Sequence, residues 1–196
     1  MKEMLTIYND ELEAIGVKSR DEVHKLGFRH RVVQCHIIKK SRKEKYIYFQ
    51  QRAYDKDICP GMYDIACAGH VDEGEEFLFS MKRELFEEVG IRIQDNDLKY
   101  AGTKFECRKS KECVDNEICE LFLLKVNSDD DFKINEEVLR MVKSPLDLYE
   151  KWVKEKIEVL PAVSLEDNKI VELNKKNSCP HIFEYSEYLL EKMKEL

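Results

Sequence analysis

The sequence predicts a single domain of the α/β class, and three observations support this. The 196 residues suffice for one complete hydrophobic core and match the usual length of one domain. Hydrophobic residues make up 43% of the chain and charged residues 37%, which is typical of a soluble globular protein with a strongly hydrated surface. Segments with the composition of strands are mixed along the chain with segments of helical periodicity. With four prolines, seven glycines and no internal repeat, the chain offers no clear linker between domains.

Residues 1–27 are expected to form an N-terminal extension that packs on the core, and the core then spans residues 28–196. Within the extension, two short apolar runs flank a polar turn and predict a hairpin, and a helical turn follows. These segments are Leu5–Tyr8, Ala14–Val17 and Asp21–Lys25.

The core is expected to begin with two antiparallel strands, Arg31–Ile38 and Tyr46–Gln51, because both are rich in β-branched and aromatic residues and a charged turn separates them. Another strand, Met62–Ala68, follows a Pro-Gly pair and leads through the turn-rich loop Gly69–Gly74 into a helix. Three further strands are predicted, at Lys99–Arg108, Ile118–Val126 and Glu137–Val142.

Two helices are expected near the C-terminus. The first begins at Ser144-Pro145, because proline suits the first helical turn, and its apolar positions have helical spacing: Leu148, Trp152, Val153 and Ile157. The second runs from Pro180 to about Met193 and carries an apolar stripe formed by Ile182, Tyr185, Tyr188, Leu189 and Met193.

The charge and composition exclude some classes of function. A net charge of −7 disfavours broad contact with nucleic acid, although a small anionic substrate remains compatible with local positive charge. The longest apolar runs are far shorter than the ~20 residues of a membrane span, and no signal region opens the chain, so we expect a cytoplasmic protein without membrane contact. The cysteines form no metal-binding spacing and are expected to be reduced thiols: Cys35, Cys59, Cys67, Cys107, Cys113, Cys119 and Cys179.

The expected helix Glu75–Val89 carries the strongest indication of chemistry. At ~100° per residue, Glu84 and Glu88 lie one turn apart with Glu87 on the adjoining flank, while the opposite face is apolar. Such crowded carboxylates repel one another unless a cation compensates them, and oxygen ligands suit Mg²⁺ or Mn²⁺. The alternative is that the three glutamates form a solvated face of a Glu-rich helix.

The full pattern resembles the complete Nudix box. It begins at Gly69, continues with Glu75, and ends in the run Arg83-Glu84-Leu85-Phe86-Glu87-Glu88-Val89-Gly90-Ile91. The resemblance implies an α/β/α sandwich around a mixed sheet, with Glu84, Glu87 and Glu88 as metal-binding carboxylates. It also implies that Arg83 holds these carboxylates, that Gly69 permits a tight loop and offers its carbonyl to metal, and that Glu75 braces the loop.

The family's chemistry implies attack of metal-activated water on a phosphorus of a diphosphate in a small molecule. The base would be Glu84 or Glu88, or else Glu137 from a later loop. Three cations are candidates to meet the diphosphate: Arg52, whose planar fork matches phosphate oxygens, together with Lys56 and Lys104. Two aromatic residues, Tyr63 and Phe105, are candidates to stack a base, although such residues more often belong to a core.

A wider segment is similar to the isopentenyl-diphosphate isomerase branch of the superfamily. The matching residues are Gln50-Gln51-Arg52, Asp57–Tyr63, Gly69-His70 and Asp115–Cys119. That resemblance implies a metal site with His30, His70, Asp115 and Glu117 as candidate ligands, and His24 as a less securely aligned one. The isomerase's catalytic cysteine precedes the Gly-His pair, where this chain has Ala68. Cys67 stands one residue earlier and on a strand would point to the opposite face.

Three functions follow, in order of preference. The first is a divalent-metal-dependent Nudix hydrolase acting on a nucleoside diphosphate derivative or a related small molecule. The second is an isopentenyl-diphosphate delta-isomerase, and the third a non-catalytic nucleotide-binding module, against which the intact carboxylate set argues. The sequence leaves a homodimer open.

Overall fold

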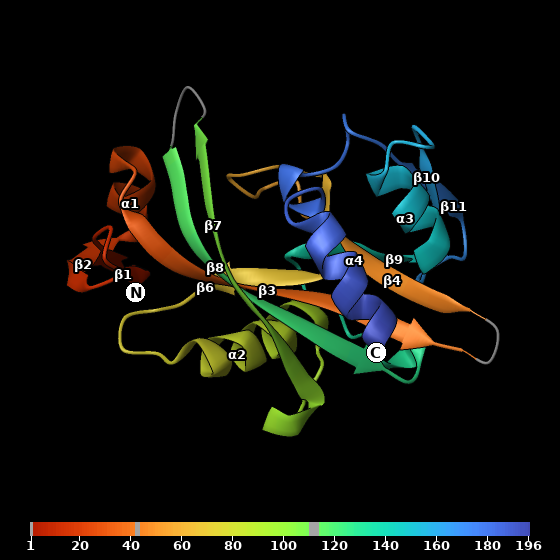
Figure 1. Cartoon of the computed structure of the whole chain (residues 1–196), viewed down its shortest axis with the longest axis horizontal. Coiled ribbons are helices and arrows are strands. Elements are labelled where there is room, and N and C mark those ends of the chain that lie inside the picture. The colour runs from red at the N-terminus through yellow and green to blue at the C-terminus, as the bar shows by residue number, and fades with distance from the viewer. Residues whose placement is uncertain (1, 42–43, 110–113) are drawn as a thin grey trace.

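A computed structural model of the chain describes residues 2–41, 44–109 and 114–196, and Figure 1 shows its layers. In this part of the chain, eleven strands join in one sheet: β1 (Met4–Tyr8), β2 (Ala14–Ser19), β3 (Arg29–Lys40), β4 (Lys45–Arg52), β5 (Tyr63–Ile65), β6 (Cys67–His70), β7 (Leu98–Lys109), β8 (Val114–Val126), β9 (Val138–Pro145), β10 (Leu160–Ser164) and β11 (Ile170–Leu173). The α-helices are α1 (Arg20–Leu26), α2 (Phe77–Val89), α3 (Leu146–Val153) and α4 (Ser186–Glu195), and short 3₁₀ turns include η3 (Pro180–Ile182).

Strand β3 is the centre of the sheet. It pairs in parallel with β8, from Arg29 opposite Asn116 to Lys39 opposite Val126, and antiparallel with β1, β4 and β6. The remaining pairs are antiparallel, including β7 with β8 and β4 with β9. The predicted mixed sheet is therefore confirmed.

Side chains alternate across β3 and supply a core to each face of the sheet. Val33, Cys35 and Ile37 pack with Met81 and Leu85 of α2. Residues on the other side, such as Val32 and Ile38, belong to a second core with α3 and α4. Figure 1 shows α2 and α4 on separate sides of the central strands. The α/β/α sandwich is confirmed, and the apolar stripe of α2 explains why its carboxylates point away from the core.

The N-terminal extension joins the sheet at the start of β3. The hairpin β1–β2 is present as predicted, and Ile7 of β1 lies opposite His30. Helix α1 begins with a capping box of Ser19 and Glu22, which satisfies two free amides. The division of the chain at residue 27 stays a prediction.

The predicted single strand Met62–Ala68 is wrong. The chain bends at Ala66, so that β5 pairs with β4 whereas β6 pairs with β3. Ala66 and Cys67 both face the α2 core, and this interrupts the alternation that a continuous strand requires. The segment expected to be loop contributes Gly69 and His70 to β6.

The C-terminal elements also differ from the prediction. Helix α3 ends at Val153, and Glu155 adopts a left-handed conformation with φ of 54°, so the helix expected to reach Ile157 stops early. The expected helix from Pro180 is divided into η3 and α4, because Tyr185 has φ of 53°. Strands β10 and β11 were not predicted. No described helix has both the length and the apolar character that crossing a membrane requires.

Candidate active site

Arg83 organises the start of the site from the middle of α2. Its guanidinium donates to Glu75 at 3.0 Å, to Glu84 Oε1 at 2.6 Å and to Glu87 Oε2 at 3.2 Å. It also donates to the backbone carbonyl of His70 at 3.1 Å. One planar cation thus joins the helix to the loop before it and to β6, as the bracing expected of Arg83 and Glu75 requires.

Gly69 lies directly against the carboxylate of Glu84. A β-carbon at this position would lie 2.1 Å from Glu84 Cδ and 2.3 Å from Oε1. Contacts this short do not occur between real side chains, so only glycine allows β6 and the carboxylate to approach so closely.

Glu88 is buried at 4% exposure, and its Oε2 accepts hydrogen bonds from Gln50 Nε2 at 3.1 Å and Ala68 N at 3.3 Å. Burial raises the pKa of Glu88. Burial, followed by the neighbouring Glu88, raises the pKa of Glu84 to about 8. Glu88 is buried and Glu84 half-buried, and ionisation of both is disfavoured. A divalent cation would stabilise such a pair, and all the donor atoms are the hard oxygens that Mg²⁺ and Mn²⁺ prefer.

These carboxylates face a polar cleft of about 390 Å³. The helix glutamates and two of the three expected cations line it, among other residues: Arg52, Lys56, Gly69, Arg83, Glu84, Glu87, Glu88 and Glu137. Lys56 forms an ion pair with Glu137 inside the cleft. Arg52 is committed to protein contacts, because it donates to the Ile58 carbonyl at 3.0 Å and to buried Asp64 at 3.3 Å.

Arg20 is a lining residue that the sequence reasoning missed. It stands at the start of α1 and lies 3.0 Å from Asp57 and 3.5 Å from Glu3. It therefore brings a cation from the N-terminal extension to the same cleft. A single arginine ahead of a short predicted helix gave no signal in the sequence.

Three histidines meet beside the cleft. The rings of His24, His30 and His70 lie 5.1 to 5.3 Å apart, and their ligand atoms fall within one group of metal-binding size. Asp115 Oδ1 lies 3.7 Å from Nε2 of both His24 and His30. These three atoms are buried without a hydrogen-bond partner. Burial lowers the pKa of His24 and brings that of His30 to about 4, which keeps the imidazoles neutral and able to bind metal.

Glu117 belongs to this histidine group rather than to the helix carboxylates. Its ligand atom groups with those of His30 and Asp115, and also with those of Glu106 and His181. The ligand groups of the described residues do not join Glu117 to the α2 glutamates, and strand β3 lies between β8, which carries Glu117, and β6.

His181 and Arg108 are further residues that the sequence did not indicate. Backbone hydrogen bonds between Tyr63 and the segment at Asn177–Cys179 hold η3 over the sheet. His181 Nδ1 then lies 3.2 Å from Asp64. Arg108 contacts His181 and Glu106, and lies 3.2 Å from Asp115. The Arg108 guanidinium therefore already compensates the negative charge of the carboxylates near Glu106.

Ala68 lies beside Glu117 and His181 on a small cavity of about 80 Å³. Cys67 packs instead in the α2 core, so the opposite facing of these neighbours is confirmed. The Cys67 thiol is nevertheless not remote from the site, because Glu88 is close enough to contribute to the pKa shift of this thiol. Burial raises the pKa of Cys67 well above its usual range. The described cysteines are free, and Cys113 lies outside the described residues.

Three other candidates lie away from the cleft. Lys104 does not line the cleft, and its ammonium lies 4.2 Å from the centroid of the Tyr188 ring. Tyr63 is a core residue with 7% exposure, whereas Phe105 is exposed.

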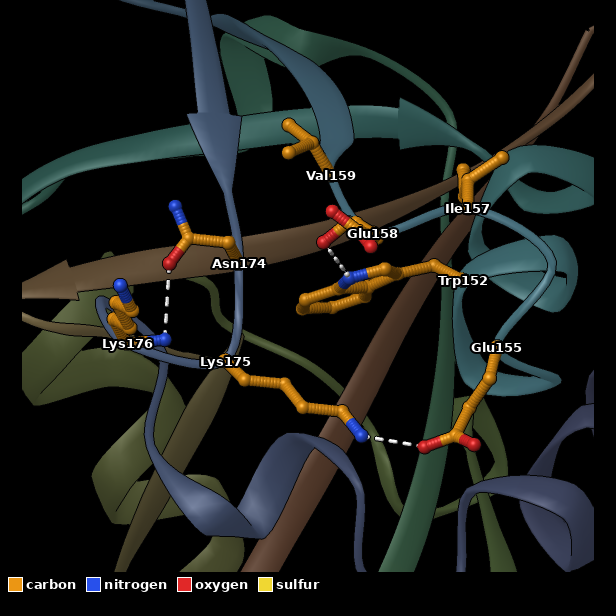
Figure 2. Close-up of a pocket in the computed structure, with 8 residues that line it drawn as sticks. All are labelled: Trp152, Glu155, Ile157, Glu158, Val159, Asn174, Lys175 and Lys176. Carbon is orange, nitrogen blue, oxygen red and sulfur yellow. Dashed lines mark hydrogen bonds and ion pairs between the residues drawn. The ribbon is translucent and has the colours of Figure 1, made fainter.

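A larger cavity, of about 570 Å³, is not the candidate site. It lies between the end of α3 and the turn after β11, with the Trp152 indole on its floor (Figure 2). Lys175 reaches across it to Glu155 at 2.5 Å, and Trp152 donates to the Glu158 carbonyl. Figure 2 shows the ion pair of Lys175 with Glu155 across this cavity, and the helix carboxylates lie elsewhere.

Comparison with known proteins identifies the family. The NUDIX domain model matches residues 28–163. An uncharacterised Nudix hydrolase of Clostridium acetobutylicum is 31% identical over 200 residues, which cover 96% of each chain. An isopentenyl-diphosphate delta-isomerase of Saccharopolyspora erythraea is 29% identical over 121 residues, covering 61% of each. The crystal structure of a Nudix hydrolase from M. smegmatis shares the fold with a TM-score of 0.52 at 10% identity, covering 97% of this chain and 92% of that one. The protein therefore belongs to the Nudix superfamily as a Nudix hydrolase with an isopentenyl-diphosphate isomerase-like sequence.

Proposed function

We propose that this enzyme hydrolyses a diphosphate linkage in a small molecule, such as a nucleoside diphosphate derivative, with the help of Mg²⁺ or Mn²⁺. The observation that carries the proposal is the pair of carboxylates, buried Glu88 and half-buried Glu84, at the wall of a cleft that also holds Arg20 and Lys56. Carboxylates would hold the cation while the basic side chains meet the phosphate oxygens.

The chain's own residues would divide the work as follows. Glu84, Glu87 and Glu88 would hold the cation, and Arg83 fixes the carboxylates of Glu84 and Glu87. When bound, a divalent cation lowers the pKa of water and neutralises charge on the phosphate. A carboxylate must then accept the water proton. Glu84, Glu88 and Glu137 are the candidates, and all three line the cleft.

The histidine group supports a second cation site of the kind that the isomerase resemblance implies. The unpartnered buried atoms of His24, His30 and Asp115 favour it, because buried polar atoms without partners are rare in the absence of a ligand. Imidazole nitrogen and carboxylate oxygen together suit Zn²⁺ or Mn²⁺.

Isomerisation is the less favoured activity because the pocket it would need is poorly equipped. Ala68 has no proton to exchange, and the cavity it shares with Glu117 is small. Incubation with isopentenyl diphosphate in heavy water should give neither dimethylallyl diphosphate nor deuterium incorporation. Rapid isomerisation would reverse this preference.

The decisive experiment measures product release from nucleoside diphosphate derivatives, sugar nucleotides and isopentenyl diphosphate, each with Mg²⁺ or Mn²⁺. At least one nucleotide-type diphosphate should yield a monophosphate, and chelation should stop the reaction. Tight binding of a nucleotide without turnover under every metal would instead support the non-catalytic module. The cytoplasmic location and the homodimer stay predictions.

A further inference from the structure

The carboxylate of Glu88 is hydrogen-bonded to a side chain of strand β4. Gln50 lies in the middle of β4, is 1% exposed, and donates its side-chain amide to Glu88 Oε2 at 3.1 Å. Its backbone is fixed on both sides, because Gln50 lies opposite Asp64 of β5 and Met141 of β9. The donor therefore stands on one of the more rigid parts of the fold.

Both N–H donors converge on one oxygen. Ala68 N donates to the same Oε2 at 3.3 Å. A carboxylate with one oxygen engaged by two fixed donors cannot rotate freely. Its other oxygen, Oε1, remains for a ligand in the cleft that Glu88 lines.

We propose that Gln50 is a positioning residue, which orients Glu88 so that Oε1 is presented to the divalent cation. The inference rests on the proposed function, in which Glu88 binds that cation. Partners of this kind orient metal ligands in many sites, and losing one typically reduces metal affinity or activity by about 10- to 100-fold.

The chemical type of the donor supports this role. A lysine or arginine here would neutralise the Glu88 charge and compete with the cation. The glutamine amide donates a hydrogen bond without carrying a charge, so it does not compete with the cation for the carboxylate. A buried glutamine with a purely structural role would also need a hydrogen-bond partner. That partner would not need to be a metal-binding carboxylate.

Binding of Mn²⁺ to the metal-free protein, followed by electron paramagnetic resonance, tests the proposal without any substrate. Gln50→Met should weaken Mn²⁺ binding about 10-fold and lower kcat about 10-fold or more, while KM for the diphosphate substrate changes little. Gln51→Met is the matched control. It also removes one hydrogen bond donated by a side-chain amide of β4, but that bond goes to Gly61 O at 2.9 Å and not to Glu88. Equal Mn²⁺ affinity and equal kcat in the two variants would overturn the proposal.

Gln50→Lys covers the case in which Gln50→Met does not fold, because it keeps a donor at this position and adds a charge. It should bind Mn²⁺ at least as weakly as Gln50→Met, and unchanged affinity would contradict the need for a neutral donor. A wild-type protein that binds no Mn²⁺ would overturn the proposed function itself. Mn²⁺ binding by the wild type with no difference among the variants would overturn only the role of Gln50.

Discussion

The α-carbon of Gly69 lies so close to Glu84 that an added methyl group would occupy the position of the carboxylate, 2.1 Å from Cδ. Gly69→Ala should therefore displace Glu84 and weaken Mn²⁺ binding by about 10-fold or more, as loss of an ordered ligand does. Gly74→Ala is the control for backbone strain, since Gly74 has φ of 79° but open space around it. It should lower thermal stability and keep Mn²⁺ affinity. Equal affinities in both variants would show that the close contact has no bearing on metal binding.

Glu88→Gln should preserve the fold, because the amide oxygen can still accept from Gln50 and Ala68 N. Metal-dependent turnover should fall by roughly 100-fold or more, since the substitution removes a charged ligand at constant shape. Glu87→Gln should have a smaller effect, because the Glu87 side chain is 53% exposed and water can replace it. Steady-state kinetics at saturating Mn²⁺ and a thermal melt measure the two effects. Near-normal turnover by a folded Glu88→Gln enzyme would refute the assignment.

Lys56 and Arg52 should respond differently to truncation. Lys56→Met should raise KM for the diphosphate about 10-fold with little change in melting temperature, because its pair with Glu137 lies at the cleft and is partly hydrated. Arg52→Ala should destabilise the fold by about 3 kcal/mol, since it leaves the buried Asp64 carboxylate without this partner. Chemical denaturation and initial-rate kinetics on both variants check this. A stable Arg52→Ala protein would mean that His181 alone compensates Asp64.

The affinity for Mn²⁺ should rise with pH. Burial and Glu88 raise the pKa of Glu84 to about 8, so below that pH the cation must displace a proton. The raised pKa also means that the metal-free protein loses stability as the pH rises toward 8, where Glu84 ionises, and bound Mn²⁺ should restore it. Between pH 6 and 8 the apparent affinity should change by up to about tenfold per pH unit for one displaced proton. Calorimetric titration of wild type and Glu84→Gln would check this, and an equal slope in both would assign the proton elsewhere.

The sequence predicted the parts of the fold that depend on local pattern. Helix α2 combines an apolar stripe with a complete motif, and both survive in the structure because Met81 and Leu85 pack on β3. The cleft could be anticipated in part for the same reason, since Arg83 and the glutamates lie on one helix. The division of Met62–Ala68 into β5 and β6 was not predicted, because the bend at Ala66 depends on which strand each half of this segment pairs with. The sequence of the segment alone does not determine that pairing.

Residues that reach the site from distant parts of the chain had no local signal. His181 follows a proline in a segment that has helical spacing, and its position depends on backbone bonds to Tyr63. Arg20 and His24 reach the site because β1 pairs with β3 near His30. Both cases require tertiary contacts that composition and periodicity do not encode.

The long parallel ladder between β3 and β8 also bears on the order of folding. Its partners, such as His30 and Glu117, stand far apart in the chain, and parallel pairs of this kind close large loops whose entropy must be overcome before the contacts form. The hairpins β1–β2 and β10–β11 close short loops and are expected to form early, whereas the histidine group cannot assemble until this ladder is in place. The histidine group should thus become able to bind a cation late in refolding. This should coincide with burial of the central core and follow the first formation of helix.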